Sequence, residues 1–173
     1  MYRKLMSVAA SLIALGGCGS DATTAPEPRA DLSACPNLQV PANSQLVSHV
    51  FASGVQIYQW ADTSWLLVSP SASLTSDVEG RASVGLHYAG PTWEATGGGK
   101  VTGAVQDRCT PNANAIPWLL LKATWDGRPG AFAGATHIQR VATTGGMAPS
   151  APGTKGQILS VPYRAEYYFY RSR

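Results

Sequence analysis

Short segments in which apolar and polar residues alternate recur along the chain beyond residue 35. The clearest is VPYRAEYYFYR at residues 161–171, in which every second residue from Val161 to Phe169 is apolar or aromatic. Successive side chains of a β-strand point to opposite faces, so this segment predicts a strand with one buried face. GKVTGAVQ at 99–106 and SVGLHY at 83–88 alternate in the same way.

Similar patterns predict five further strands, and the connections between them have the composition of turns. The five are QLVSHVF (45–51), GVQIYQW (54–60), SWLLV (64–68), PWLLLKATW (117–125) and AFAGATHIQRV (131–141). Connections such as SPSAS (69–73), ATGGGK (95–100) and DGRPG (126–130) carry the Gly, Pro, Asp and Ser that turns require. Eight or nine short strands at this spacing predict a single all-β domain, either an antiparallel sandwich or a barrel.

The beginning of the chain has a different pattern, typical of a secretory signal. Arg3 and Lys4 precede an apolar run from Leu5 to Leu15, which is followed by small residues. This run is too short to cross a bilayer as a permanent transmembrane helix. The following LGGC resembles the lipobox of bacterial lipoproteins, in which the cysteine, here Cys18, is lipidated and becomes the mature N-terminus. The alternative is an ordinary signal peptide with a chance cysteine. We therefore expect a signal peptide over residues 1–17.

Lipid on Cys18 would anchor the protein in the cell envelope. Residues 18–34 are poor in apolar side chains and rich in Ala, Thr and Pro, which predicts a flexible tether. Gly19 after the cysteine resembles the outer-membrane sorting pattern of Gram-negative lipoproteins, so we expect the outer membrane or periplasm if the host is Gram-negative. Residues 35–173 then form one domain, long enough to bury a core.

Charge and cysteine content narrow the possible partners. Without Arg3 and Lys4 the formal net charge falls from +3 to +1, because 13 basic and 10 acidic residues become 11 and 10. A nucleic-acid partner is therefore not expected. Export to an oxidising compartment favours a disulfide between the two remaining cysteines, Cys35 and Cys109, with two free buried thiols as the alternative. The sequence leaves the oligomeric state open.

Five stretches together resemble domain-of-unknown-function family 3455: GVQIY (54–58), HYAGPTWE (87–94), AIPWLLL (115–121), IQRVATTGGMAP (138–149) and VPYRAEYYFY (161–170). The resemblance implies a small exported protein of bacteria or fungi and supplies no activity or catalytic residue. In that family a cysteine often follows QIY and another follows GGxAP, whereas Trp60 and Ser150 stand in those regions here. The resemblance therefore gives no support to a pairing of Cys35 with Cys109.

Some members of that family carry a malate dehydrogenase label, which would require a nucleotide site. The single glycine cluster, TGGGKVTG at 96–103, leads from one predicted strand into another instead of opening a helix. Val101 also stands where a phosphate-binding loop needs Ser or Thr. We expect a β-turn there and no cofactor.

The three histidines occur singly, without a spacing typical of metal ligands, so we expect no metal centre. His49 shares a strand face with Val47 and Phe51, which predicts a core or barrel-lining position. His87 lies opposite Leu86 and its apolar neighbours, so it points outward or into a cleft if the apolar side faces the core.

The stretch HYAGPTWE contains the main candidates for chemistry. Pro91 lacks an N–H and Gly90 tolerates unusual backbone angles, so the strand should break or bulge there. Trp93 would then plug the core or line the rim of a cleft. Glu94 would pair with Lys100 or Arg140, or act with His87 as an acid–base or ligand pair.

Aromatic side chains suggest a second kind of site, because flat rings on a rigid β-scaffold can stack on sugars or other planar ligands. The candidates are Tyr88, Trp93, Trp118, Tyr168 and Tyr170, of which Tyr168 and Tyr170 share the polar face of the last predicted strand.

Two hypotheses of different class follow. The first is a lipid-anchored module without catalysis, which binds a saccharide or small ligand or has a structural role in the envelope. The second is a small extracytoplasmic hydrolase or metal-assisted enzyme that uses His87 and Glu94, with Arg140 as a further candidate. Convergence of His87 and Glu94 in a pocket would favour the enzyme, and an aromatic platform would favour the binding module.

Overall fold

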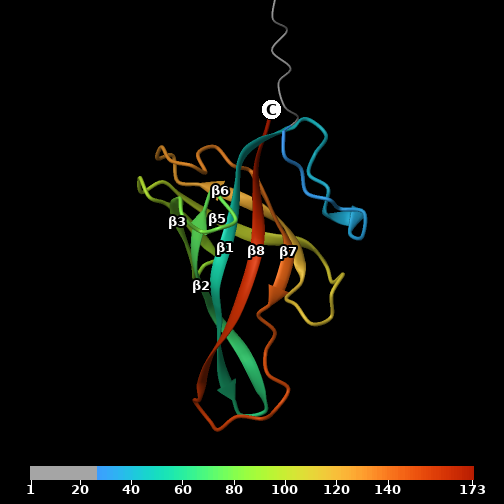
Figure 1. Cartoon of the computed structure of the whole chain (residues 1–173), viewed down its shortest axis with the longest axis vertical. Helices are drawn as coiled ribbons and strands as arrows, with labels where there is room; N and C mark the ends of the chain where they lie inside the picture. The colour runs from blue at the N-terminus through green and yellow to red at the C-terminus, as the bar shows by residue number, and fades with distance from the viewer. Residues whose placement is uncertain (1–26) are drawn as a thin grey trace, which may run out of the picture.

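The computed structural model describes residues 27–173, which form one closed, antiparallel barrel of eight strands (Figure 1). Each strand pairs with the next along the chain, and the last strand closes the barrel against the first. The predicted all-β fold is confirmed, with a barrel as its form. The strands are β1 (Ser44–Ala61), β2 (Ser64–Thr75), β3 (Ser83–Tyr88), β4 (Thr92–Ala95), β5 (Lys100–Cys109), β6 (Trp118–Trp125), β7 (His137–Gly145) and β8 (Ile158–Ser172).

The barrel interior holds the main hydrophobic core. On β8 the predicted alternation is confirmed, because Tyr163, Ala165, Tyr167 and Phe169 are all buried in this core. The segment 131–141 is only partly a strand, since β7 begins at His137. The preceding turn instead places the Phe132 ring inside the barrel, stacked on Phe169 with centroids 4.3 Å apart.

The first two strands are longer than the sequence predicts. Segments 45–51 and 54–60 belong to the single strand β1, and the predicted turn at 69–73 lies within β2. Gly54 marks a close approach of two backbones, because a Cβ there would collide with the carbonyl oxygen of Ser71. Pro70 is tolerated within β2 because this part of the strand pairs with β1 alone in the described chain.

Unequal strand lengths leave an opening in the barrel wall. β3 pairs with β2 only at Ser83–His87, opposite residues 72–75, and β4 pairs with β5 only at residues 100–102. Beyond these short strands, no strand of the described chain pairs with residues 67–70 of β2 on the side away from β1, and these residues line one cavity together with Val105 and Arg108 of β5. The β3–β4 turn, residues 89–91, closes the upper end of this opening, which we call the wall gap. The predicted break at Gly90–Pro91 is thereby confirmed.

A second hydrophobic cluster lies outside the barrel, where the segment before β1 packs against it. Leu32, Cys35 and Leu38 are buried there, with Leu38 in the short 3-10 helix η1 (Pro36–Leu38). The disulfide between Cys35 and Cys109 ties this segment to β5, as predicted. Packing begins at Ala30, within the predicted tether. The predicted signal peptide and Cys18 lie outside the described residues.

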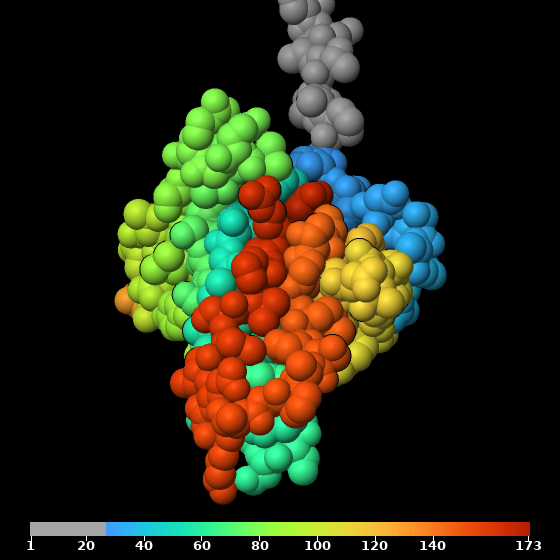
Figure 2. Space-filling model, turned by 60° about the horizontal axis from the view of Figure 1, so that its bottom comes forward, coloured from blue at the N-terminus to red at the C-terminus, as the bar shows by residue number. Residues whose placement is uncertain are grey.

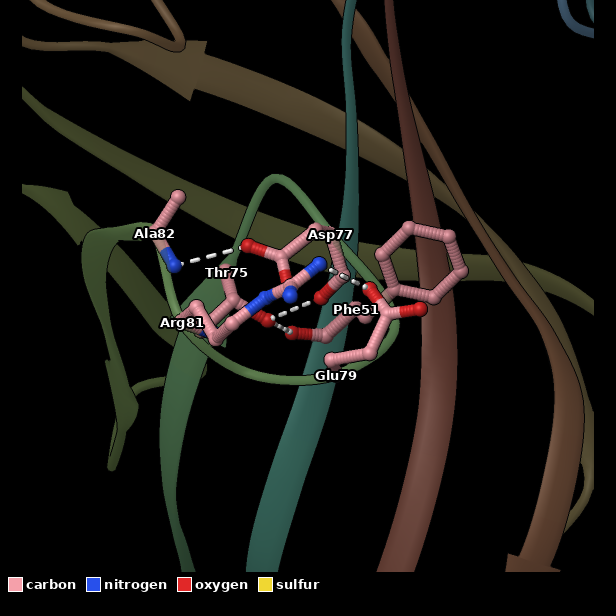
Figure 3. A network of polar contacts seen from close by, with 6 residues as sticks. All are labelled: Phe51, Thr75, Asp77, Glu79, Arg81 and Ala82. Carbon is pink, nitrogen blue, oxygen red and sulfur yellow. Dashed lines mark hydrogen bonds and ion pairs between the residues drawn. The ribbon is translucent and has the colours of Figure 1, made fainter.

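The β2–β3 loop, residues 76–82, is held by its own polar groups (Figure 3). The Asp77 carboxylate accepts hydrogen bonds from the backbone N–H groups of Arg81 at 3.0 Å and Ala82 at 2.7 Å, and these bonds lower the pKa of Asp77. Arg81 in turn reaches the Glu79 carboxylate at 3.2 Å. Both acidic groups are therefore engaged within the loop.

At the lower end of the barrel, the β7–β8 connection lies beside the β1–β2 hairpin (Figure 2). The Trp65 indole N–H donates to the carbonyl of Ala151 at 2.9 Å, and the backbone N–H of Trp60 donates to that of Gln157 at 2.8 Å. These contacts fix the long hairpin that forms one side of the wall gap.

Candidate functional site

A cavity of about 390 Å³ lies behind the wall gap. Its volume is toward the lower end of the roughly 300–1,000 Å³ seen in small-molecule sites. Leu67 and Val68 of β2 and Val105 of β5 line the cavity and are about half exposed, so the cavity meets solvent through the gap. Leu119 and Leu121 of β6 continue its apolar wall inside the barrel.

The polar side of the cavity is assembled from strands that are far apart in the sequence. The inner faces of five strands supply Gln56 (β1), His87 (β3), Trp93 (β4), Arg140 (β7) and Tyr167 (β8). Residues that lie opposite each other on adjacent strands have their side chains on the same face of the sheet. The five groups therefore share the barrel interior although up to 111 positions separate them in the sequence. His87 and Trp93 are direct cross-strand partners.

His87 faces the barrel interior, which corrects the expected orientation of β3. The premise that the apolar side of this strand faces the core is wrong: Leu86 is 54% exposed, whereas His87 is 2% exposed. The bulky rings of Trp93 and Tyr167 already fill this part of the interior beside the flat imidazole of His87, while Val84 at the start of β3 still packs against the core. The His87 and Trp93 rings are stacked, with centroids 4.3 Å apart.

The environment of His87 keeps its imidazole neutral. Burial lowers the pKa of His87 to about 4, and the nearby Arg140 charge acts in the same direction. Nδ1 lies 2.9 Å from the carbonyl oxygen of Thr92, which can only accept, so Nδ1 carries the proton and donates. Nε2 is then the unprotonated, acceptor nitrogen of the ring.

Arg140 places a positive charge at this cavity. Its Nε and Nη2 donate to the carbonyl oxygen of Pro117 at 3.1 and 2.8 Å. No carboxylate of the described residues forms an ion pair with it. The guanidinium also opposes the effect of burial, which raises the pKa of Tyr167. Arg140 is thus a cation among aromatic side chains, held from one edge by a backbone carbonyl.

Three side chains of the cavity lining have buried polar atoms without a hydrogen-bond partner in the described chain. They are Gln56 Nε2, Trp93 Nε1 and the Tyr167 hydroxyl, on side chains that are at most 2% exposed. Leaving such a group unsatisfied costs about 1–3 kcal/mol, so most buried polar groups in proteins are paired. A ligand with acceptor atoms would offset that cost.

Glu94 lies on the opposite side of the barrel wall from His87. Its Oε2 accepts a hydrogen bond from the Tyr88 hydroxyl at 2.7 Å and lies 3.2 Å from Lys100 Nζ. The Tyr88 hydrogen bond, followed by Lys100, lowers the pKa of Glu94. Pairing with Lys100 was one of the two expected alternatives and is confirmed. The acid–base pair of His87 and Glu94 is not formed, whereas His87 and Arg140 do share the cavity.

Tyr168 and Tyr170, binding candidates because they share the polar face of the last predicted strand, are buried instead of exposed. Both side chains point away from the barrel interior, as the alternation of β8 predicts, but the segment around Leu32 and Leu38 covers them. Trp118 is half-buried against the same cluster. The polar face of the last strand is therefore partly an interface with the chain that precedes β1.

His49 is also placed differently from its predicted core position. A β-bulge between Leu46 and Ser48 reverses the alternation of β1, so that Val50 points inward and His49 outward. The imidazole stacks on Tyr168 with centroids 4.0 Å apart and bonds to Glu166 at 2.8 Å. Of the residues predicted to form an aromatic platform, only Trp93 lines the cavity.

Sequence reasoning missed Gln56 and treated Tyr167 as core alone. The signal for Gln56 was present in GVQIYQW, where it shares a strand face with Tyr58. A lone amide on a buried face needs partners, and such a residue is a candidate for ligand contact. The histidines of the described chain remain dispersed, and no group of three potential metal ligands occurs within residues 27–173.

Comparison with models of protein families assigns the chain to one family. Residues 41–171 match the model of a family described as "Protein of unknown function (DUF3455)". The chain belongs to this family. Each of the five stretches that resemble DUF3455 contributes to the cavity lining, with Gln56, His87, Leu119, Arg140 and Tyr167 as one example from each. No curated protein and no solved structure shows significant similarity to this DUF3455 chain.

Proposed function

We propose that this DUF3455 protein is a lipid-anchored, extracytoplasmic module that binds a small ligand in the barrel cavity without catalysing a reaction. One observation carries the proposal: the cavity of about 390 Å³ opens at the wall gap and is lined by buried polar groups that lack partners. An apolar pocket with a few convergent polar groups is the usual form of a small-molecule site.

The arrangement of the candidate residues favours binding over hydrolysis. His87 and Glu94, on which the enzyme hypothesis depends, lie on opposite sides of the barrel wall. The aromatic rings do not assemble into an exposed platform, since Trp93 is stacked on His87 and Tyr168 and Tyr170 are covered. We therefore favour a compact ligand inside the barrel over a saccharide stacked on its surface.

The proposed location rests on the lipobox at Cys18 and on the tether that follows it. The disulfide between Cys35 and Cys109 fits an oxidising compartment outside the cytoplasm. Within residues 27–173 no helix has the length and apolar character needed to cross a bilayer.

Titration with 1-aminoanthracene, an uncharged probe that fluoresces in apolar surroundings, tests the proposal. The mature chain would carry Cys18→Ser so that no detergent competes for the cavity. We expect saturable 1:1 binding that Val105→Trp abolishes, because Val105 lines the mouth of the cavity. Ile158→Trp is the matched control, since Ile158 is an exposed strand residue away from the cavity. Absence of saturable binding, or equal binding by both variants, would refute the proposal.

A further inference from the structure

We infer that the cavity is built for an apolar carboxylate, whose anionic group meets Arg140 and the buried donors around it. This inference rests on the proposed function, because it names the class of ligand that the same cavity would take. Charge, donor chemistry and the distribution of apolar side chains lead to it independently.

The charge of the cavity is positive. Arg140 lies inside it and Arg108 lies at the mouth, whereas none of the lining side chains in the described chain is acidic. His87 is neutral and adds no charge of either sign. A cation next to apolar walls is poorly solvated, so an anion that enters gains more there than it would at the protein surface.

The unpartnered polar atoms of the lining are hydrogen-bond donors. The Gln56 amide nitrogen and the Trp93 indole nitrogen can only donate, and the Tyr167 hydroxyl can donate as well. Pro117 occupies the Nε and Nη2 edge of Arg140 and leaves Nη1 for another acceptor. An excess of donors over acceptors selects a group with several acceptor atoms and no proton to give, such as a carboxylate.

The remaining surface of the cavity suits an apolar body. Leu67, Val68 and Pro70 form one wall, and Leu119 and Leu121 form part of the other. A polyol in this space would bring hydroxyl groups against side chains that offer them no hydrogen bond. A flat aromatic or short aliphatic acid instead places its one charged group at Arg140 and its body between these walls.

Binding of 2-naphthoate and of 2-naphthamide, its uncharged analogue of the same shape, tests the inference by isothermal titration calorimetry. We expect the carboxylate to bind at least about tenfold more tightly, because hydrogen bonds to a charged partner are the stronger ones. Arg140→Gln should remove this preference, since glutamine can still donate to Pro117 but carries no charge. Arg164→Gln is the matched control, since Arg164 is an exposed cation that does not line the cavity, and this variant should retain the preference.

The outcomes separate the two proposals. Equal affinities for the two naphthalene compounds, with 1-aminoanthracene still bound, would overturn the carboxylate inference and leave the binding function intact. A preference that persists in Arg140→Gln would also overturn it, by removing Arg140 from the site. Failure of all three probes to bind the mature Cys18→Ser chain, with no substitution in the cavity, would overturn both proposals. The comparison of the two naphthalene compounds needs no variant, so it decides the matter even if Arg140→Gln fails to fold.

Discussion

The buried His87 should make the stability of the barrel depend on pH. In the folded protein its pKa is about 4, against 6.5 for an ordinary histidine, because burial disfavours the charged ring. As pH falls, the unfolded chain takes up a proton at His87 near pH 6.5, whereas the folded chain takes it up only near pH 4. The unfolded state therefore binds more protons over this interval, and stability falls as pH falls.

The size of the effect follows from the difference between the two pKa values. At about 1.4 kcal/mol for each pH unit, the full contribution is about 3 kcal/mol, and about 2 kcal/mol of it is lost between pH 7.5 and pH 5. Above pH 6.5 the contribution is complete. His87 is almost fully buried, so solvent screening reduces it little.

Urea unfolding at pH 7.5 and pH 5, with the disulfide intact, measures this loss. The reference is His87→Gln, which can still donate a hydrogen bond to Thr92 but does not titrate. Between the two pH values the parent protein should lose about 2 kcal/mol more unfolding free energy than the variant. Contributions from the remaining titratable groups cancel in this comparison. The same pH dependence in both proteins would refute a neutral, buried His87.

Three further predictions concern covalent and surface features. Replacing both Cys35 and Cys109 by Ala should lower the unfolding free energy by about 4 kcal/mol in urea unfolding, because the disulfide closes a long loop in the unfolded chain; an unchanged midpoint would contradict this. Glu94→Gln should leave the thermal midpoint nearly unchanged in calorimetry, because its partner Lys100 is also partly exposed and surface pairs contribute little; a loss of several degrees would assign the pair a structural role. Cys18→Ser should move the mature protein from the detergent phase to the aqueous phase in Triton X-114 partitioning, and identical fractionation of variant and parent would argue against a lipid anchor.

The features predicted correctly from the sequence are those determined locally. The alternation of β8 and the break at Gly90–Pro91 each depend on a few neighbouring residues. The pairing of Cys35 with Cys109 follows from the expectation of an oxidising compartment. The fold class follows in the same way from many short alternating segments. Alternation separates two strand faces but does not say which face the barrel encloses.

The candidate site was only partly predictable because it depends on that choice of face. Leu86 lies on the apolar side of β3, yet His87 is the side chain that points into the barrel. Rings from neighbouring strands, such as Trp93, occupy the rest of the interior around it. In β1 a single bulge reverses the alternation and turns His49 outward. Tyr168 and Tyr170 are buried by the segment before β1, which no pattern within β8 could indicate. Arg140 was identified as a candidate, but Gln56, which lines the same cavity, comes from a strand more than 80 positions away.

The wall gap also bears on how quickly a ligand could exchange. Residues 64–71 of β2 and 103–109 of β5 are not joined to each other by ladder hydrogen bonds in the described chain. A ligand can therefore pass between them when side chains such as Leu67 and Val68 move, which takes nanoseconds, instead of waiting for strands to separate. If the proposed binding is correct, residence time in the cavity would be set by the contacts of the ligand and not by the stability of the barrel. Substitutions that strengthen the barrel far from the gap should slow hydrogen exchange in the core strands while leaving ligand release unchanged.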